Sequence, residues 1–278
     1  VFLGDVGVDV GAGLIDNRGS LIRSGATATL IAGTVDNRDT QGSGQGIEGR
    51  SVLIRAGQLA NVAGALRADE RLDIVGGGVQ DNTRGFIASG QTLSLRDGRA
   101  EGKTQAVINA GGTLLAGQSL LVDSASLGGD GKLLSHGDLA LRIAGDYTHT
   151  GQFQADGNAS LVTTGTFINR ATLVAGGTLS VSSAGIDNTA TGEMTGGATR
   201  VATAGTLTNR GLIDGGDVRI DAGSLANLGS GRIYGTRLAV QAGSLLNAEE
   251  GDRAATIAAR ERLDLGVQSL TNREHALI

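Results

Sequence analysis

The chain has 278 residues, 40% of them hydrophobic, and a formal net charge of −5 at pH 7. This balance excludes a disordered chain and argues against nucleic acid as the main partner. The absence of cysteine excludes disulfides and thiolate metal sites. Aromatic residues make up only 2% of the chain, fewer than a large globular enzyme uses to fill its core and line its cleft.

The N-terminal stretch, VFLGDVGVDVGAG, has neither the positive segment nor the continuous apolar run of a signal peptide. No stretch of the chain approaches the roughly 18 consecutive apolar residues that a membrane-spanning helix needs. The sequence pattern is already under way at Val1 and unfinished at Ile278. We therefore expect the chain to be a fragment of a longer protein.

An asparagine recurs along the whole chain at intervals that average about 21 residues. Eleven of the twelve asparagines fall on this register, and Gly128 and His149 occupy two further positions of it, which gives thirteen repeats. The eleven register positions are Asn17, Asn37, Asn61, Asn82, Asn109, Asn169, Asn188, Asn209, Asn227, Asn247 and Asn272.

Each repeat contains three short patterns with a period of two, which is the period of a β-strand. One ends at the asparagine, the next is a middle segment such as Gly211–Asp214, and the third carries an aliphatic pair such as Val218 and Ile220. Glycines separate the patterns. Parallel stacking of successive repeats satisfies the backbone groups of strands this short and buries one apolar column, so the pattern predicts an all-β parallel solenoid. A leucine-rich repeat has a similar period, but its Leu/Asn consensus and helical return segment are missing.

The asparagines are predicted to turn inward and form a ladder. In a parallel stack, equivalent side chains lie above one another, so each amide can donate to one coil and accept from its neighbour. Aspartate there would stack like charges, and leucine would leave backbone groups at the corner unpaired. Gly128 and His149 interrupt this ladder, and we expect a water or another side chain to substitute there.

Three insertions break the rhythm, at Asp39–Gly49, Asp97–Thr104 and Ala248–Ala255. The first and third follow an asparagine directly and are expected to leave from the asparagine corner. The second follows an aliphatic-pair strand and is expected to leave from another corner. Loops on a rigid scaffold are common recognition sites, but we favour simple tolerance of insertions as the explanation.

Five arginines directly follow register asparagines and should emerge at one corner: Arg18, Arg38, Arg170, Arg210 and Arg273. A basic stripe of this kind could contact sulfated glycans or anionic lipopolysaccharide. Aspartates stand near some of them, at Asp16, Asp36 and Asp187, and the stripe has gaps of several coils. A solvated face with local ion pairs is therefore the alternative interpretation.

Two glycine-rich motifs suggest ligands. Gly44, Gly46 and Gly49 match the G-x-G-x-x-G of dinucleotide sites, but no helix pattern follows them, so we interpret this stretch as a surface loop. It runs into Ile47–Arg50, the recognition sequence of a clotting protease, which should cut after Arg50 if the loop projects. Residues 127–134 resemble one copy of a calcium-binding nonapeptide, whereas such sites need several copies. We predict no metal and no cofactor.

The repeat pattern lacks the combination of residues that a catalytic site of a β-helical enzyme needs. Sites of β-helical polysaccharide-degrading enzymes combine carboxylates on adjacent coils with sugar-stacking aromatics. No Asp or Glu column persists here beside an aromatic residue, and His136, His149 and His275 occupy unrelated positions. We predict no enzyme and no catalytic residue, and we expect His149 to be an inward, hydrogen-bonded substitute for asparagine.

Phrases such as AGLIDNRGSLI (12–22), INRATLVAGGTLSV (168–181) and AGTLTNRGLIDGG (204–216) resemble the degenerate repeat of filamentous haemagglutinins. These are exoproteins of bacterial two-partner secretion, among them the contact-dependent growth inhibition proteins, and the resemblance covers essentially the whole chain. It implies a right-handed parallel β-helix, here a single β-helical repeat domain over residues 1–278. It also implies a secreted shaft on the bacterial cell surface, exported through an outer-membrane transporter. Disulfides formed before export would obstruct that passage, which fits the absence of cysteine.

The resemblance leaves three functions open. The first is the shaft of an adhesin that attaches to a host-cell glycan or receptor, or to a neighbouring bacterium. The second is the non-binding stalk of a toxin-delivery protein for contact-dependent growth inhibition. The third is a polysaccharide-degrading enzyme. Neither the receptor nor the binding faces follow from the sequence, and nor do the end caps and the oligomeric state.

Overall fold

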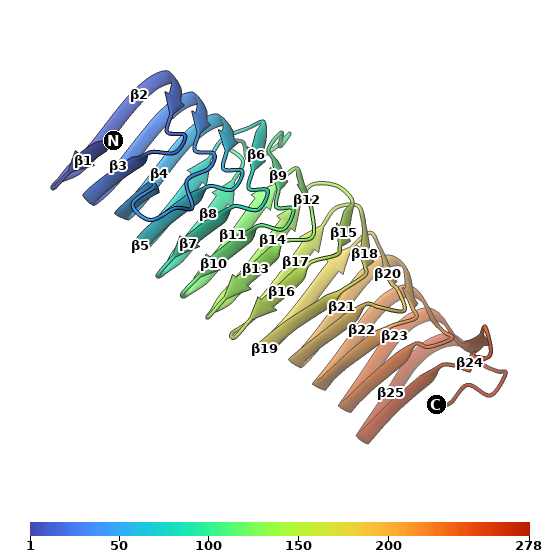
Figure 1. The fold of residues 1–278 in the computed structure, drawn as a ribbon. Helices are drawn as coiled ribbons and strands as arrows, with labels where there is room; N and C mark the ends of the chain where they lie inside the picture. The colour runs from blue at the N-terminus through green and yellow to red at the C-terminus, as the bar shows by residue number, and fades with distance from the viewer. The chain divides into compact units, whose positions relative to one another are not determined.

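The structure, a computed structural model, describes all residues from Val1 to Ile278 and contains strands but no helix (Figure 1). It therefore has no helix that could span a membrane. The chain forms two compact units, unit 1 (Val1–Ala144) and unit 2 (Gly145–Ile278). In each unit the strands of one repeat pair in parallel with the equivalent strands of the next repeat, which confirms the predicted parallel β-solenoid.

Unit 1 contains fourteen strands, which follow one another around the coils. They are β1 (Phe2–Gly4), β2 (Gly7–Asp16), β3 (Leu21–Asp36), β4 (Gly46–Ala60), β5 (Ala65–Val75), β6 (Val79–Asp81), β7 (Phe86–Ser89), β8 (Thr92–Arg96), β9 (Ala106–Ile108), β10 (Thr113–Ala116), β11 (Ser119–Ser124), β12 (Ser126–Gly128), β13 (Lys132–Ser135) and β14 (Asp138–Ile143).

Unit 2 contains eleven strands. They are β15 (Tyr147–His149), β16 (Gln152–Ala155), β17 (Ala159–Thr163), β18 (Thr166–Asn169), β19 (Thr172–Ser183), β20 (Gly185–Asn188), β21 (Glu193–Asn209), β22 (Leu212–Leu228), β23 (Arg232–Glu250), β24 (Arg253–Ala254) and β25 (Thr256–Asn272). In β21, β22 and β25 one strand bends around a whole repeat, whereas β16, β17 and β18 divide a repeat among three strands. Both forms carry the three patterns seen in the sequence.

Stacking in register builds the core. In unit 1 the middle segments place Ile22, Ile47, Leu66, Ile87, Leu114 and Leu133 directly above one another. In unit 2 the same column is Phe153, Leu173, Met194, Ile213, Ile233 and Ile257. All are buried, because alternate residues of each strand point inward. The aliphatic pairs and the residues before each asparagine line the other two sides of this interior.

The first two coils of unit 2 enclose aromatic rings. Tyr147 and Phe167 stack with ring centroids 5.8 Å apart, and Phe153 is fully buried beside His149. These rings fill the width that aliphatic side chains fill elsewhere in the unit. The scarcity of aromatic residues therefore reflects a narrow interior, which few large rings can enter.

The first insertion is shorter than expected. The irregular stretch ends at Gln45, and Gly46–Gly49 forms the start of β4 with Ile47 fully buried (Figure 1). The interpretation of residues 42–49 as a surface loop is wrong for its second half, because Ile47 is the inward residue of a middle segment. Gly46 also sits so close to the carbonyl oxygen of Ala65 that a Cβ would lie 2.6 Å from it.

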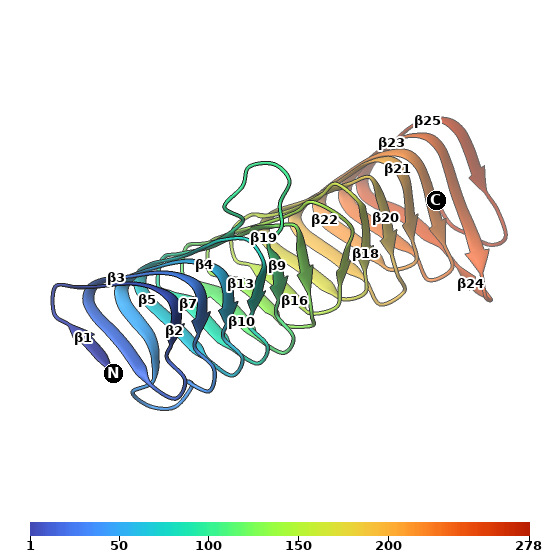
Figure 2. The same ribbon diagram turned by 90° about the horizontal axis from the view of Figure 1, so that it is seen from above.

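The other two insertions differ from each other. Residues 97–105 contain no strand, and residues 98–104 project from unit 1 after β8 (Figure 2), whereas Asp97 and Gln105 at their two ends are buried. Residues 249–254, by contrast, form an antiparallel hairpin of the end of β23 with β24. Its turn residues Gly251 and Asp252 both have φ of 58°, as a two-residue primed hairpin turn requires. A hairpin was not expected, because the sequence has no Asn-Gly turn, and Gly-Asp here supplies the backbone conformation that such a turn requires.

Candidate functional site

The asparagine corner, where each repeat's last strand meets the next turn, carries the register residues on its inside and the five arginines on its outside. The asparagine backbone belongs to the parallel ladder, as in the bond of 2.8 Å from Asn37 N to the Ala60 oxygen. In unit 1 the second residue after each asparagine has a left-handed φ between 47° and 59°. Those residues are Gly19, Asp39, Ala63, Arg84 and Gly111. The corner is therefore a tight turn that forces the asparagine side chain inward.

In unit 1 each of the first four register asparagines donates a hydrogen bond to the side chain of the next. The distance from Nδ2 to Oδ1 is 2.8 Å for Asn17 to Asn37, 2.7 Å for Asn37 to Asn61, 2.7 Å for Asn61 to Asn82 and 2.8 Å for Asn82 to Asn109. The same nitrogen also donates to a backbone carbonyl, such as that of Gly46 at 3.1 Å from Asn17. All five side chains are at most 2% exposed. The amides thus satisfy one another's hydrogen-bonding groups.

Unit 2 contains a second run of the ladder. The distance from Nδ2 to Oδ1 is 2.8 Å for Asn169 to Asn188, 2.7 Å for Asn188 to Asn209, and 2.8 Å for Asn209 to Asn227, Asn227 to Asn247 and Asn247 to Asn272. Donation always runs toward the next repeat. The predicted ladder is confirmed, with one refinement: the main partner of each amide is another amide, with backbone carbonyls second.

The two register positions without asparagine, Gly128 and His149, interrupt the ladder in different ways. In unit 1 the amide of Asn109 donates to the Lys132 carbonyl at 3.2 Å, while Gly128 offers no side chain. In unit 2 His149 is 2% exposed, with Nδ1 3.2 Å from the Tyr147 hydroxyl and Nε2 3.2 Å from the Thr172 carbonyl oxygen. Burial lowers the pKa of His149. This histidine is inward and hydrogen-bonded, as predicted.

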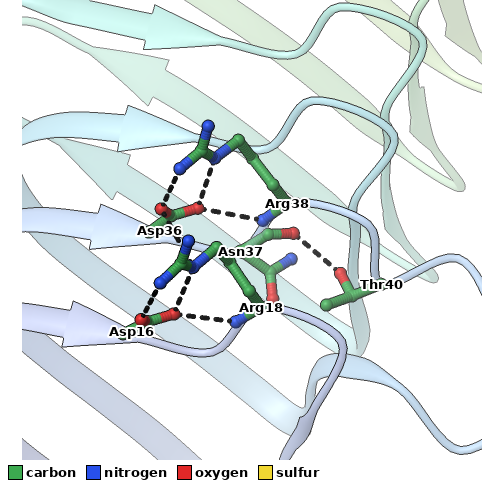
Figure 3. Close-up of polar contacts among 6 residues, drawn as sticks. All are labelled: Asp16, Arg18, Asp36, Asn37, Arg38 and Thr40. Carbon is green, nitrogen blue, oxygen red and sulfur yellow. Dashed lines mark hydrogen bonds and ion pairs between the residues drawn. The ribbon is translucent and has the colours of Figure 1, made fainter.

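Thr40 is a residue of the corner that the sequence does not reveal. Its hydroxyl donates to the Asn37 carbonyl at 2.8 Å (Figure 3). The same hydroxyl accepts a hydrogen bond from the Ala65 backbone at 3.1 Å. It is fully buried. Thr40 thereby closes the coil from which the first insertion leaves. An insertion shifts the register locally, so counting positions could not place this threonine at the corner.

Outside the corner, the first two arginines are bound to aspartates (Figure 3). Arg18 contacts both oxygens of Asp16, at 2.9 and 2.6 Å, and Arg38 contacts both oxygens of Asp36, at 2.8 and 2.6 Å. Hydrogen bonds from the Arg18 side chain and backbone lower the pKa of Asp16 to about 2. Both arginine side chains are about half exposed. Each guanidinium is thus largely neutralised where it meets solvent.

The three arginines of unit 2 do not form a stripe. Arg210 binds Glu250 of the hairpin at 2.5 Å and lies 3.8 Å from Asp187, and Arg273 lies 3.7 Å from Glu274. Arg170 is exposed and forms no ion pair. The structure thus places each arginine at the asparagine corner of its own coil, but in unit 2 Thr189, Leu228 and Ala248 occupy this position in the intervening repeats.

The remaining sequence candidates, which are the region 127–134, His275 and the second insertion, make contacts within the protein. In the region 127–134, Asp130 accepts a hydrogen bond of 2.8 Å from the Gly111 backbone of the preceding coil. His275 lies 3.0 Å from Glu249 on the surface. No group of three or more His, Asp or Glu side chains is arranged as metal ligands. In the second insertion, both oxygens of Asp97 accept backbone hydrogen bonds, from Arg99 at 2.9 Å and from Gln105 at 2.6 Å.

The haemagglutinin repeat family matches residues 4–76, 54–142, 119–171, 135–211 and 212–278. The chain belongs to this family. A Dickeya dadantii protein named deoxyribonuclease CdiA is 32% identical over 242 residues, which are 79% of this chain and 7% of that protein. The chain thus spans only a small part of this relative. No solved structure matches the chain. Together with the fold, these similarities identify the chain as a shaft segment of a secreted, surface-exposed protein of two-partner secretion.

Proposed function

We propose that the chain is part of the shaft of an adhesin of the filamentous haemagglutinin type, and that the shaft itself contacts host or bacterial cells. The observation that supports a role as a shaft is the amide ladder, whose buried hydrogen bonds link successive coils. A stack held in this way extends a chain and keeps its outward side chains at fixed intervals. An outer-membrane transporter of the two-partner secretion type is the partner during export.

Contact with a cell requires outward groups that are not already paired. Arg18, Arg38 and Arg210 are bound to carboxylates, so we do not place the contact on them. We place the contact with a host-cell glycan, a receptor or anionic lipopolysaccharide on Arg170 and on residues 98–102 of the second insertion, which are exposed and form no ion pair.

The second candidate is a non-binding stalk that presents a toxin to a neighbouring bacterium. The similarity to the Dickeya protein favours it. We do not assign the deoxyribonuclease activity in that protein's name to this chain, because the matched segment is 7% of it and is built of solenoid repeats. We likewise assign no catalytic residue, cofactor or metal to the shaft.

Cell binding by the purified chain separates the two candidates. Fluorescently labelled protein is added to epithelial cells and to Gram-negative bacteria, and bound fluorescence is measured against concentration. An adhesin shaft gives saturable binding, which falls when residues 98–103 are deleted or when Arg170 is replaced by glutamine. A Thr189→Ala variant, at the same corner position in the next repeat, is the matched control. Linear, non-saturable uptake on every cell type contradicts the adhesin and leaves the stalk.

A further inference from the structure

One face of unit 2 carries a groove that none of the functions above uses. It has a volume of about 530 Å³ and crosses four coils, where the middle segments of β21, β22, β23 and β25 turn into the aliphatic-pair segments. Its side chains include Thr195, Asp214, Tyr234 and Arg260. The volume lies within the range of about 300 to 1,000 Å³ typical of small-molecule sites.

The register explains why these groups meet. Met194, Ile213 and Ile233 stack inside the coil, so the residues after them point outward on neighbouring coils. Asp214 and Tyr234 are therefore adjacent, about 5 Å apart along the stack. A hydrogen bond of 2.6 Å from Thr199 to the Asp214 carbonyl fixes the backbone beneath them.

Glycines form the floor of the groove. At Gly215 a Cβ would lie 3.0 Å from the Gly196 carbonyl oxygen and 3.1 Å from the Thr199 hydroxyl. The close packing of backbones at this corner thus excludes larger side chains. As a consequence the surface beside Tyr234 is hollow.

The two charged groups of the groove, Asp214 and Arg260, form no ion pair, in contrast to those of the neighbouring face. There, Arg219 binds Asp221, Arg237 binds Asp217 and Arg262 binds Asp264, at 2.5 to 2.7 Å. In the groove, Asp214 accepts one hydrogen bond, from the Gly215 backbone at 2.8 Å. The Tyr234 hydroxyl and the Arg260 guanidinium have no partner within the protein.

We propose that this groove binds an uncharged oligosaccharide, with a sugar ring against Tyr234, Asp214 accepting hydrogen bonds from sugar hydroxyls and Arg260 donating to sugar oxygens. Tyrosine combines an apolar ring with a polar tip, which suits the mixed surface of a sugar. Asp214 and Arg260 lie on coils two apart, about 10 Å along the stack, a distance that a di- or trisaccharide spans. One carboxylate and one guanidinium leave the groove without net charge, which disfavours anionic glycans.

The backbone excludes a peptide added as an extra strand. Asp214 lies in β22 and Tyr234 in β23, and each of these strands pairs on both sides within the stack. A peptide would therefore find no free strand edge in the groove. The proposal deepens the adhesin function and rests on it, since it names the chemical class of a surface ligand for the shaft.

The test uses the fact that the chain has only two tyrosines. Protein labelled with ¹³C in tyrosine gives one signal set from buried Tyr147 and one from Tyr234, which Tyr234→Phe assigns by its loss. Cellotriose, maltotriose and globotriose are titrated separately, together with a heparin-derived trisaccharide as the anionic probe. We expect at least one neutral trisaccharide to shift the Tyr234 signals saturably while the Tyr147 signals stay in place.

Variants locate the site. With the bound trisaccharide followed by calorimetry, Tyr234→Ala should raise Kd at least about tenfold, while Tyr234→Phe, which keeps the ring, should stay within about threefold. Asp214→Asn should also weaken binding about tenfold. Phe86→Ala, which removes an outward aromatic residue from a middle segment of unit 1, is the matched control and should leave Kd unchanged.

Two results would overturn the proposal: no shift of Tyr234 with any neutral trisaccharide, or a shift with the heparin-derived probe alone. These outcomes are distinct from failure of the adhesin function. If Tyr234→Ala still binds cells like the unaltered chain, the groove is not the contact and the adhesin function stands. If the trisaccharide binds at Tyr234 but the chain does not bind cells, the site stands and the adhesin function fails.

Discussion

At the scale of single residues, asparagine is needed for its two kinds of hydrogen-bonding group. Asn188 accepts from Asn169 at 2.8 Å and donates to Asn209 at 2.7 Å and to the Leu212 carbonyl at 3.2 Å. A hydroxyl has too few groups for this role, and a carboxylate has no donor at neutral pH. The recurrence of asparagine in the sequence follows from this requirement.

Removal of one ladder residue should therefore be costly. We expect Asn188→Ala to lower the free energy of unfolding by about 2 to 4 kcal/mol, because it leaves buried partners on both sides unsatisfied. Asn158→Ala, at the one asparagine outside the register, is the control and should cost less than about 1 kcal/mol. The urea midpoint measures both. Equal shifts of the urea midpoint for the two variants would show that a ladder asparagine contributes no more to stability than an asparagine outside the ladder.

His149 gives the stack a pH dependence that asparagine does not have. Because burial lowers its pKa in the folded state below the 6.5 of an exposed histidine, the unfolded chain binds more protons in mild acid. The contribution of His149 to stability is therefore complete above about pH 6.5 and is lost as the pH falls toward the lowered folded pKa. Protonation would also put a charge beside Tyr147 and Phe153 in the aromatic interior.

We expect the melting temperature of the unaltered chain to fall between pH 7 and pH 5, and His149→Asn to flatten that fall. Asn169 lies directly opposite His149 in the parallel pairing of β15 and β18, so an amide there can extend the ladder. Thermal unfolding followed by circular dichroism measures this. A profile unchanged by His149→Asn would assign the acid sensitivity elsewhere.

At the scale of elements, inward residues determine where an insertion ends. Ile47 belongs to the buried column of unit 1, so β4 begins at Gly46 even though the sequence there is glycine-rich. Arg50 follows within the same strand and contacts Glu70 at 2.7 Å. Residues 47–49 of the protease recognition sequence are thus paired on both sides, and Arg50 lies at the register shift that follows them within β4.

We accordingly expect the folded chain to resist the clotting protease that cuts after Ile-Glu-Gly-Arg. A protease needs an extended, unpaired substrate, and β4 is paired on both sides, by β3 and β5. Gel electrophoresis should show no cleavage after Arg50 in buffer and complete cleavage in moderate urea. Trypsin at low dose is the comparison, since it should nick the projecting loop at Arg99 or Lys103 first. Rapid cutting after Arg50 in buffer would mean that β4 is not formed there.

At the scale of the whole molecule, the repeat is the unit of structure. Each coil contributes one rung to the ladder and one residue to each apolar column, so its neighbours need only the correct register. Deletion of one complete repeat, residues 189–209, should keep a folded chain with a melting temperature within about 5 °C. Deletion of residues 189–199 removes half a repeat and should unfold part of unit 2, since it brings outward residues into the column. Equal melting temperatures of the two deletion variants would contradict the idea that stability depends on keeping the repeats in register.

The sequence by itself determined the parallel solenoid, its thirteen repeats and the inward asparagines, because stacking repeats the same chemical requirement at every coil. It also indicated the inward His149. Two features depended on tertiary structure: where the insertions end and which outward charges are paired. Arg210 binds Glu250 two repeats away, and Asp214 and Tyr234 from adjacent repeats line one groove. Such arrangements depend on where each chain segment bends and on where small residues leave the surface hollow. The periodicity of the sequence gives neither the bends nor the hollows.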